Sequence, residues 1–373
     1  MTKITDIPAI RFKGFSDTWE QRKVSELFKV TRGYVLAATL TEPAKTDEMP
    51  YPVYSSQTKD NGLMGYYKDY LYEDAITWTT DGANAGTVNY RAGKFYCTNV
   101  CGVLLSNEVT ANQMIAEALN NVAKGYVSYV GNPKLMNNVV ADIEIMIPTH
   151  AEEREKLSVF FRNLDNLITL HQRKYDKLTN VKKSMLEKMF PQNGSNVPEI
   201  RFKGFTEAWE QRKVREITDR YDNLRIPVAA SLRIAGTTPY YGANGIQDYV
   251  EGYTHDGEFI LVAEDGANDL KNYPVKCVKG RIWVNNHAHV LQGKCACADN
   301  QFLAYAISQA DIESLLVGGG RAKLNAETLM DIELLLPSKD EQIQIGSYLA
   351  RLDNLITLHQ RKPNFYTGGY YAE

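Results

Sequence analysis

Between residues 151 and 190 the chain has neither proline nor glycine, and apolar or aromatic side chains recur there every seven positions. One stripe consists of Leu157, Leu164, His171, Leu178 and Met185, and most of a second consists of Phe161, Ile168, Tyr175 and Met189. This spacing predicts a long amphipathic helix with a coiled-coil seam. We expect the helix to end at the segment 191–198, which contains two prolines and a glycine.

The remaining hydrophobic positions follow a different pattern. Short runs rich in tyrosine, valine and threonine are separated by glycine and asparagine, which is typical of β-strands joined by turns. Two Asp-Gly pairs, Asp81-Gly82 and Asp265-Gly266, predict hairpin-like turns between such strands.

The chain contains one sequence frame twice. The segment Pro8-Ala-Ile-Arg-Phe-Lys-Gly-Phe15 returns with one change at 198–205, and Leu164-Asp-Asn-Leu-Ile-Thr-Leu-His-Gln-Arg-Lys174 returns unchanged at 352–362. The distance between the copies is far longer than the roughly 20–50 residues of a solenoid repeat. The repeat therefore predicts an α+β protein with two tandem pseudo-repeated domains of mixed α/β structure, each with a β-rich part and each followed by a long spacer helix.

The frame also sets the expected boundaries. We predict a first domain at 1–150, a first spacer helix at 151–190, a linker at 191–198, a second domain at 199–338, a second spacer helix at 339–362 and a tail at 363–373. The tail departs from the repeat, because Pro363 and two glycines stand where the first copy continues from Tyr175. Proline and glycine stop a helix, so we expect the second spacer helix to be clipped.

The middles of the two copies differ. Residues 51–104 and 239–291 share only scattered similarities, among them an identical Asp-Gly-Ala-Asn at 81–84 and 265–268. This pattern favours a common scaffold that holds two different recognition surfaces. The alternative is that the loops simply diverged after duplication, since loops vary fastest.

Composition excludes several classes of protein. The chain has 373 residues, 44% hydrophobic and 23% charged, as in ordinary globular proteins. Its apolar runs are too short to span a bilayer, and its N-terminus has no apolar signal segment, so we expect a cytoplasmic protein without membrane contact. Five cysteines argue against a disulfide scaffold. The net charge of −3 requires that any DNA-binding basic residues gather on one face.

Common catalytic motifs are absent from the sequence. There is no G-x-x-x-x-G-K-[ST] phosphate loop, no H-E-x-x-H and no adenine methyltransferase Asn-Pro-Pro-aromatic signature. We therefore expect no catalysis by the chain alone. His287-Ala-His289 with Cys295-Ala-Cys297 could be a zinc site, but the spacing matches no common zinc motif, and buried strand residues are the simpler interpretation. We predict no metal.

Features suited to nucleic acids are more numerous. Of the 23 tyrosines, many cluster with amide, hydroxyl and basic residues in the divergent middles, and such side chains read base edges or hold phosphates. The candidate DNA contacts are Tyr54, Ser55, Ser56, Gln57, Lys59 and Asn61 in the first copy and Tyr240, Tyr241 and Asn244 in the second. Tyrosines that pack a sheet and polar residues in turns are the structural alternative. The glycine loop with Arg321 and Lys323, and Lys134 in the first copy, suits either a phosphate or an ordinary turn.

Taken together, the duplicated frame resembles the specificity subunit of type I restriction–modification systems. The resemblance covers residues 8–362, with Trp-Glu-Gln-Arg-Lys-Val near the start of each half and Asp-Ile-x-[hydrophobic]₃-Pro before each spacer helix. It implies two target recognition domains and two spacer helices that pair as an antiparallel coiled coil. It also implies that the twin turns and the segments aligned with them face DNA, which adds Asp81, Gly82, Asn84, Thr98, Asn99, Asp265, Gly266, Asn268, Asn285, Asn286 and His287 to the candidates.

The resemblance further implies a function and partners. The chain would read a bipartite, asymmetric site in double-stranded DNA and direct adenine methylation and restriction by two methyltransferase subunits and two restriction–translocase subunits. S-adenosylmethionine, ATP and Mg²⁺ would belong to those partners, which agrees with the missing motifs. The expected partner contacts lie on the seams: Leu157, Leu164, Ile168, His171, Leu178, Leu352, Leu355, Ile356 and His359. The alternative is a decoy or structural coiled-coil adaptor that binds methyltransferase subunits without reading DNA.

Overall fold

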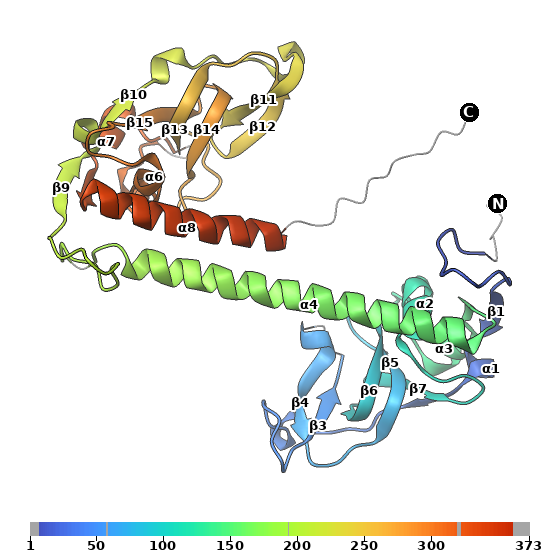
Figure 1. Ribbon diagram of the computed structural model, residues 1–373. Helices are drawn as coiled ribbons and strands as arrows, with labels where there is room; N and C mark the ends of the chain where they lie inside the picture. Colours follow the sequence, from blue (N-terminus) through green and yellow to red (C-terminus); the bar gives the residue numbers. More distant parts are fainter. Residues whose placement is uncertain (1–6, 57–58, 193, 319–321, 361–373) are drawn as a thin grey trace. The chain divides into compact units, whose positions relative to one another are not determined.

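The computed structural model describes residues 7–56, 59–192, 194–318 and 322–360. The chain divides into two compact units, Met1–Thr169 and Leu170–Glu373. Figure 1 shows the elements of each unit. Gln57, Arg321 and the predicted tail 363–373 lie outside the described residues, as does the side chain of Lys59.

Unit 1 is built around a six-stranded sheet. Its strand order is β2 (Phe28–Arg32), β7 (Cys101–Ser106), β5 (Tyr72–Thr79), β6 (Val88–Cys97), β3 (Tyr51–Tyr54) and β4 (Leu63–Tyr67). All neighbouring strands are antiparallel except β3 and β6. Strands β5 and β6 form a hairpin whose connection contains Asp81-Gly82, so the turn predicted there is confirmed.

The other elements of unit 1 cover this sheet and lead to the long helix. A two-stranded sheet pairs β1 (Glu20–Lys23) with β8 (Glu144–Ile147). The helical segments are α1 (Val24–Leu27), η1 (Ala38–Leu40), η2 (Lys59–Gly62), α2 (Gln113–Ala123), η3 (Lys124–Tyr126) and α3 (Asn137–Asp142). Side chains from β5, β8 and α2 meet in one buried cluster, which is the main core of the unit.

Unit 2 repeats this plan. Its sheet has the order β10 (Thr218–Arg220), β15 (Ala288–Gly293), β13 (His255–Ala263), β14 (Val275–Val284), β11 (Ala235–Gly242) and β12 (Gly245–Val250), and β9 (Glu210–Lys213) pairs with β16 (Glu333–Leu336). Its short helical segments are α5 (Val214–Ile217), η4 (Asp222–Leu224), η5 (Ala230–Leu232), α6 (Asn300–Ser308), η6 (Glu313–Leu315) and α7 (Ala326–Asp331). The hairpin of β13 and β14 contains Asp265-Gly266, which confirms the second predicted turn.

Two long helices accompany the sheets, α4 (Ala151–Lys188) and α8 (Lys339–Gln360). The boundary between the units falls within α4, so its N-terminal half belongs to unit 1 and its C-terminal half to unit 2. Within unit 2 that C-terminal half runs antiparallel to α8, as Figure 1 shows, and Leu178 and Leu352 join the same hydrophobic cluster. These elements confirm the predicted α+β fold class.

The duplicated N-terminal frame has a structural role in each unit. Arg11 donates from Nε and Nη2 to the two carboxylate oxygens of Glu153 near the start of α4, each at 2.7 Å. In the same way Arg201 holds Glu341 near the start of α8, at 2.7 and 2.8 Å. Both glutamate side chains are completely buried. Each arginine therefore fixes a spacer helix to its own domain, which explains why this part of the frame occurs in both copies.

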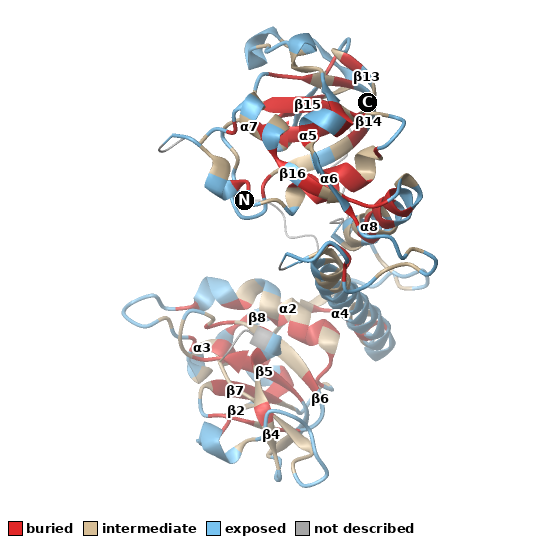
Figure 2. Ribbon diagram, turned by 90° about the vertical axis from the view of Figure 1, so that its left-hand side faces the viewer, coloured by how far each residue is buried: buried red, intermediate tan, exposed pale blue. Residues whose placement is uncertain are grey.

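Burial is concentrated within each sheet and the helices next to it, as Figure 2 shows in red. Trp78 and Phe95 are among the largest fully buried side chains of unit 1, and Tyr240 and Phe302 among those of unit 2. Within the described ranges, no helix has both the length and the apolar composition to cross a bilayer.

Candidate nucleic-acid interface

Three segments that were predicted to contact DNA meet at one end of the sheet in unit 1. The Thr98 N–H donates to the Tyr54 carbonyl (2.9 Å), and the Thr98 hydroxyl contacts the Ser55 hydroxyl (3.0 Å). On the other side the Thr80 N–H donates to the Val100 carbonyl (3.0 Å). The end of β3, the turn between β6 and β7 and the end of β5 are therefore held together by backbone hydrogen bonds.

The lysine loop of unit 1 joins the same end of the sheet. The Gly82 N–H donates to the Pro133 carbonyl (2.9 Å), and the Leu135 N–H donates to the Thr80 carbonyl (2.8 Å). The ammonium of Lys134 lies 3.6 Å from a carboxylate oxygen of Asp81, and half of the lysine side chain (52%) is exposed. This loop thus presents a positive charge next to the Asp-Gly turn.

Arg91, which the sequence did not identify, orders the tyrosine of this site. Its guanidinium carbon lies 3.7 Å from the centre of the Tyr54 ring, and its Nη2 donates to the Asn61 carbonyl (2.7 Å). Its Nε donates to the Thr77 hydroxyl (3.1 Å), and the residue is buried. Burial lowers the pKa of Arg91 from its ordinary value. One face of Tyr54 is therefore already occupied by a cation. The signal for this contact is absent from the local sequence, because Arg91 is distant from Tyr54 in the chain.

Unit 2 brings the corresponding segments together with the same backbone pattern. The Asn285 N–H donates to the Tyr241 carbonyl (3.1 Å), as Thr98 does to Tyr54. The Glu264 N–H donates to the His287 carbonyl (2.9 Å), and the Leu324 N–H donates to the Glu264 carbonyl (2.8 Å). The shared pattern pairs Thr98 with Asn285, Val100 with His287 and Thr80 with Glu264. The scaffold is the same, but the side chains on it differ.

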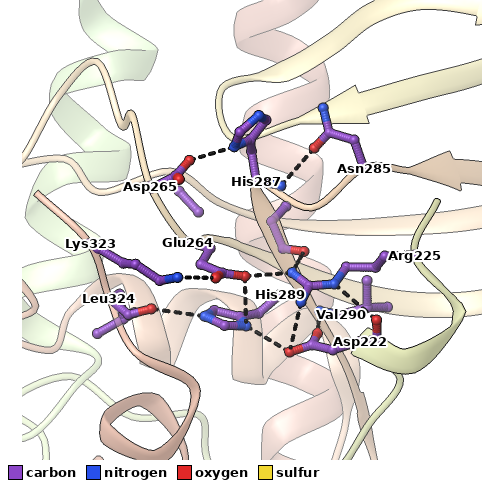
Figure 3. A network of polar contacts seen from close by, with 12 residues as sticks. Asp222, Arg225, Glu264, Asp265, Asn285, His287, His289, Val290, Lys323 and Leu324 are labelled. Carbon is purple, nitrogen blue, oxygen red and sulfur yellow. Dashed lines mark hydrogen bonds and ion pairs between the residues drawn. The ribbon is translucent and has the colours of Figure 1, made fainter. Parts of the chain in front are cut away.

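The polar side chains of this site in unit 2 fix one another, as Figure 3 shows for Asp265, Asn285 and His287. The His287 ring contacts the Asp265 carboxylate (Nδ1 to Oδ1, 2.6 Å), and the Asn285 side-chain oxygen accepts from the His287 N–H (2.8 Å). Asn244 reaches the Asp-Gly turn as well. Its amide nitrogen donates to the Gly266 carbonyl (2.9 Å), and its oxygen accepts from the Asn268 N–H (2.9 Å). These contacts hold the turn and the two loops in one arrangement.

A charged network that has no counterpart in the predictions lies beneath this surface (Figure 3). Glu264 accepts from Arg225 at 2.6 Å and from Lys323 at 2.8 Å. The two nitrogens of His289 face a carboxylate oxygen of Asp222 (2.8 Å) and the Leu324 carbonyl (2.9 Å). Both of these partners are hydrogen-bond acceptors, so the ring is held from two sides.

The network also sets the charge of its two acids. Burial alone would raise the pKa of Asp222, but hydrogen bonds from His289 and the Val290 N–H, together with the charge of Arg225, hold it below its ordinary value. The pKa of Glu264 is likewise lowered, because its ion pairs with Lys323 and Arg225 outweigh its burial. At neutral pH both groups are therefore ionised, and Glu264 holds the exposed Lys323 beside the Asp265 turn.

The predicted DNA contacts differ widely in exposure. Four of them have side chains that are almost completely buried: Thr98, Tyr240, Tyr241 and Asn285. The hydroxyl of Tyr240, for example, accepts a hydrogen bond from the Val228 N–H, and Arg233 covers its ring (4.1 Å). Half-buried residues are Tyr54, Ser55, Ser56, Asp81, Gly82, Asn84, Asp265 and His287. Exposed residues are Asn61, Asn99, Lys134, Asn244, Gly266, Asn268, Asn286 and Lys323. Only the last two groups offer surface to a ligand.

The residues of the suggested zinc site lie in different surroundings. His289 is in the core and binds Asp222, whereas Cys295 and Cys297 are exposed in the loop after β15. Over the described ranges, no group of three or more His, Cys, Asp or Glu side chains is arranged to hold a metal ion.

The predicted partner contacts on the helices also divide into two groups. Leu157 packs on the core of unit 1, and Leu178 and Leu352 pack in the core of unit 2. Leu164, Ile168 and Leu355 are exposed by 39%, 66% and 43%. Ile356 and His359 are half-buried, and His171 is exposed. The seam is therefore closed by α8 in unit 2 and is open along the N-terminal half of α4.

Comparisons with known proteins show which proteins this chain resembles. A protein of Haemophilus influenzae assigned as a type I restriction enzyme specificity subunit is 43% identical over 146 residues, which are 39% of this chain and 38% of that protein. The MpnII type I restriction enzyme specificity subunit of Mycoplasma pneumoniae is 32% identical over 148 residues, 39% of this chain and 43% of that subunit. The matches thus span about two fifths of the length of these curated relatives.

A solved structure and a family model match most of the chain and point to the same kind of protein. The crystal structure of a type I restriction–modification S subunit from M. genitalium has the same fold, with a TM-score of 0.68 and 15% identity over 95% of this chain and 93% of that chain. The family described as "Type I restriction modification DNA specificity domain" matches twice, at residues 16–180 and 206–365. The resemblance noted in the sequence is confirmed, and the chain belongs to this family of type I restriction–modification DNA specificity domains.

Proposed function

We propose that the chain is the DNA-reading subunit of a type I restriction–modification complex, and that each unit reads one part of a bipartite, asymmetric site in double-stranded DNA. The observation that carries the proposal is one backbone arrangement in two units that present different side chains. Thr98 in unit 1 corresponds to Asn285 in unit 2, and Val100 corresponds to His287. Equal scaffolds with unequal polar groups suit the reading of two different sequences.

The parts that both units share suit the phosphate backbone. Each unit has a lysine bridged to the Asp-Gly turn, Lys134 at Asp81 and Lys323 at Asp265. An exposed ammonium beside the base-reading loops would hold phosphates of any sequence and set the position of the domain on the duplex. The exposed amides of Asn99 and Asn286, which follow Thr98 and Asn285, are then the strongest candidates for direct contact with base edges.

The chemistry of the complex would come from partners. Two methyltransferase subunits would methylate adenine with S-adenosylmethionine, and two restriction–translocase subunits would use ATP and Mg²⁺ to cleave. The chain itself would supply recognition only, because its sequence has no nucleotide-binding loop and no methyltransferase signature. Purified chain should accordingly neither methylate nor cleave DNA when given all three cofactors.

The experiment that tests the proposal is methylation mapping in cells. The chain is expressed with the adenine methyltransferase subunit that co-purifies with it, and methylated adenines are mapped over the genome. We expect a two-part motif that is not a palindrome and that disappears when the chain is left out. A methyltransferase that binds the chain but produces no motif dependent on it would instead identify the chain as an adaptor.

Single substitutions assign the halves. Asn286→Ala lies in unit 2 and should relax the motif in one half only, with a loss of discrimination of about 1–3 kcal/mol at the base it reads. Asn99→Ala lies at the corresponding place in unit 1 and should relax the other half. A change in both halves from either substitution would contradict the assignment of one half to each unit.

A further inference from the structure

The two units differ at one place where the repeat makes them equal in sequence. Leu164 in unit 1 and Leu352 in unit 2 are the first residues of the identical segments 164–174 and 352–362. Leu352 is 7% exposed, because it packs in the cluster that contains Leu178 and Met185 from the C-terminal half of α4. Leu164 is 39% exposed. Among the residues that the structure describes, unit 1 therefore has the same seam residue without a helix that covers it as in unit 2.

A second difference lies at the tryptophan of the duplicated frame. Trp209 is 3% exposed, because Phe190, which follows α4, lies against it at a ring-centre distance of 5.9 Å. Phe190 also stacks on Phe302 at 5.4 Å. The equivalent Trp19 is only half-buried and lines a cavity of 320 Å³, together with Gln21, Ala118, Asn121, Val122, Glu144 and Met146. An aromatic side chain fills the place beside the tryptophan in one unit, and a cavity lies beside it in the other.

A third difference concerns charge. In unit 2 the ammonium of Lys182 lies 2.5 Å from a carboxylate oxygen of Asp353. Asp165 is the repeat equivalent of Asp353, and in unit 1 it accepts a hydrogen bond from the neutral amide of Gln113 (3.0 Å). A lysine placed on unit 1 as Lys182 is placed on unit 2 could therefore form an ion pair with the Asp165 carboxylate.

All three differences point to one missing element, a helix with the pattern of residues 175–190. That segment supplies Leu178, Met185, Lys182 and Phe190 to unit 2. After Lys362 the sequence continues with Pro363 instead of a second copy of it. Residues 1–373 thus contain this segment once, and that copy packs against unit 2. A second copy of the same chain would first have to release this segment from its own unit 2.

We propose that unit 1 is a receptor for a basic amphipathic helix of this pattern supplied by a different polypeptide that carries the same repeat. The helix would lie on Leu164 and Ile168 of α4, with a lysine at Asp165 and its terminal aromatic side chain in the cavity beside Trp19. Within unit 2 the C-terminal half of α4 makes the equivalent contacts with Leu352 and Asp353. The proposal is independent of which DNA sequence, if any, the chain reads.

The test uses the full chain and a fluorescent peptide with the sequence of residues 171–191. We expect saturable binding of one peptide per chain, measured by fluorescence anisotropy. Leu164→Asp should weaken it at least tenfold, and so should Phe190→Ala in the peptide. Leu167→Asp is the matched control and should leave binding unchanged. Its counterpart in unit 2, Leu355, is 43% exposed even though the helix partner is present there.

A second measurement covers the case in which the free peptide does not form a helix, since short helices are marginal in water. Residues 363–373 are replaced by a copy of 175–190, which supplies the helix from the same chain. We expect slower amide hydrogen exchange around Leu164 and a blue shift of Trp19 fluorescence. Failure of both the peptide and the graft overturns the proposal. A dimer of the chain that Leu164→Asp dissociates would also overturn it and would assign the face to a second copy.

Discussion

His171 on α4 and His359 on α8 face each other, with their Nδ1 atoms 2.8 Å apart. They occupy the same position in the two identical segments 164–174 and 352–362. Seven residues from this pair along each helix, Leu178 and Leu352 enter the same hydrophobic cluster. In an antiparallel pair of identical segments, equal positions lie opposite each other only at the centre of the pair. The histidine contact therefore marks that centre and fixes the register of the two helices.

This register predicts how charges at the two positions interact. Glutamate at both positions, in His171→Glu/His359→Glu, should destabilise the chain, because it places two like charges opposite each other. The double variant His171→Glu/His359→Lys should be more stable than the double glutamate variant by about 0.2–1 kcal/mol, the range of a solvent-exposed ion pair. Urea unfolding of the two double variants measures the difference. Equal stability would mean that the two positions do not oppose each other.

The arginine clamps predict a large effect from residues far from any candidate ligand. Arg11→Ala leaves the Glu153 carboxylate buried without its partner, and we expect a loss of about 3–5 kcal/mol in the free energy of unfolding. Lys13→Ala is the matched control, because Lys13 is exposed in the same frame and should change stability little. Replacing both charges, in Arg11→Met/Glu153→Leu, should recover most of the loss. No recovery would show that the arginine acts through other contacts.

Replacing the two loop lysines should change the affinity for DNA and its dependence on salt. Lys134→Ala and Lys323→Ala should each lower affinity for all sequences and reduce the slope of log affinity against log salt by about one. Neither should alter the preferred sequence. Affinity measured at several salt concentrations, on specific and random duplexes, separates this from base reading. A loss confined to the specific duplex would make the lysine a base reader.

Periodicity and repetition were sufficient to predict the long helix, the paired hairpin turns and the doubled α+β architecture, because these depend on neighbours in sequence or on the frame itself. The role of the repeated arginine could not be predicted. Arg11 and Glu153 are 142 positions apart, and only the folded chain joins them. The two arginines and two glutamates do recur at nearly equal spacing in the sequence. That spacing alone does not show that each arginine contacts a glutamate.

The candidate site was predicted in outline but not in detail. Backbone hydrogen bonds do connect the turns and loops that the sequence identified, in both units. Sequence could not tell which of their side chains point outward, and Tyr240 is in the core whereas Asn286 is exposed. The ion pairs of Glu264 were also missed, because a lone acid before an Asp-Gly turn has the composition of any solvated loop.

Those ion pairs predict that unit 2 is sensitive to acid. A carboxylate whose folded-state pKa is below its unfolded value contributes stability above the unfolded pKa and loses it as the pH falls through the folded pKa. Asp222 and Glu264 both have lowered pKa values, so their contribution is full at neutral pH and disappears in acid. Glu264→Gln should cost about 3 kcal/mol at pH 7, because Arg225 and Lys323 both lose the negative charge of Glu264.

The same substitution should also flatten the fall of stability between neutral pH and acid. Unfolding midpoints measured across that range test this, and Glu251→Gln, at an exposed acid of unit 2, is the control. A Glu264→Gln variant whose midpoint falls with acid as steeply as that of the unchanged chain would remove this carboxylate as the cause.

The last prediction concerns the unread gap between the two parts of the DNA site. If each unit reads one part, the length of α4 sets the gap, because its two halves belong to different units. Seven residues inserted after Thr169 lengthen the helix by about 10 Å and change the phase of its faces by only about 20°. They leave the contacts of His171 and Leu178 with α8 intact, since both residues follow the insertion. At roughly 3.4 Å per base pair, the gap should grow by about three base pairs.

The sequences of the two half-sites should stay the same, because no loop of either unit changes. Methylation mapping with the lengthened chain measures the gap directly. Seven residues inserted after Gln192 are the matched control, because they extend the connection beyond α4 and leave the helix at its 38 residues. We expect the control to keep the original gap. A gap that is unchanged by the insertion in α4, or changed equally by both insertions, would mean that the helix does not determine the spacing.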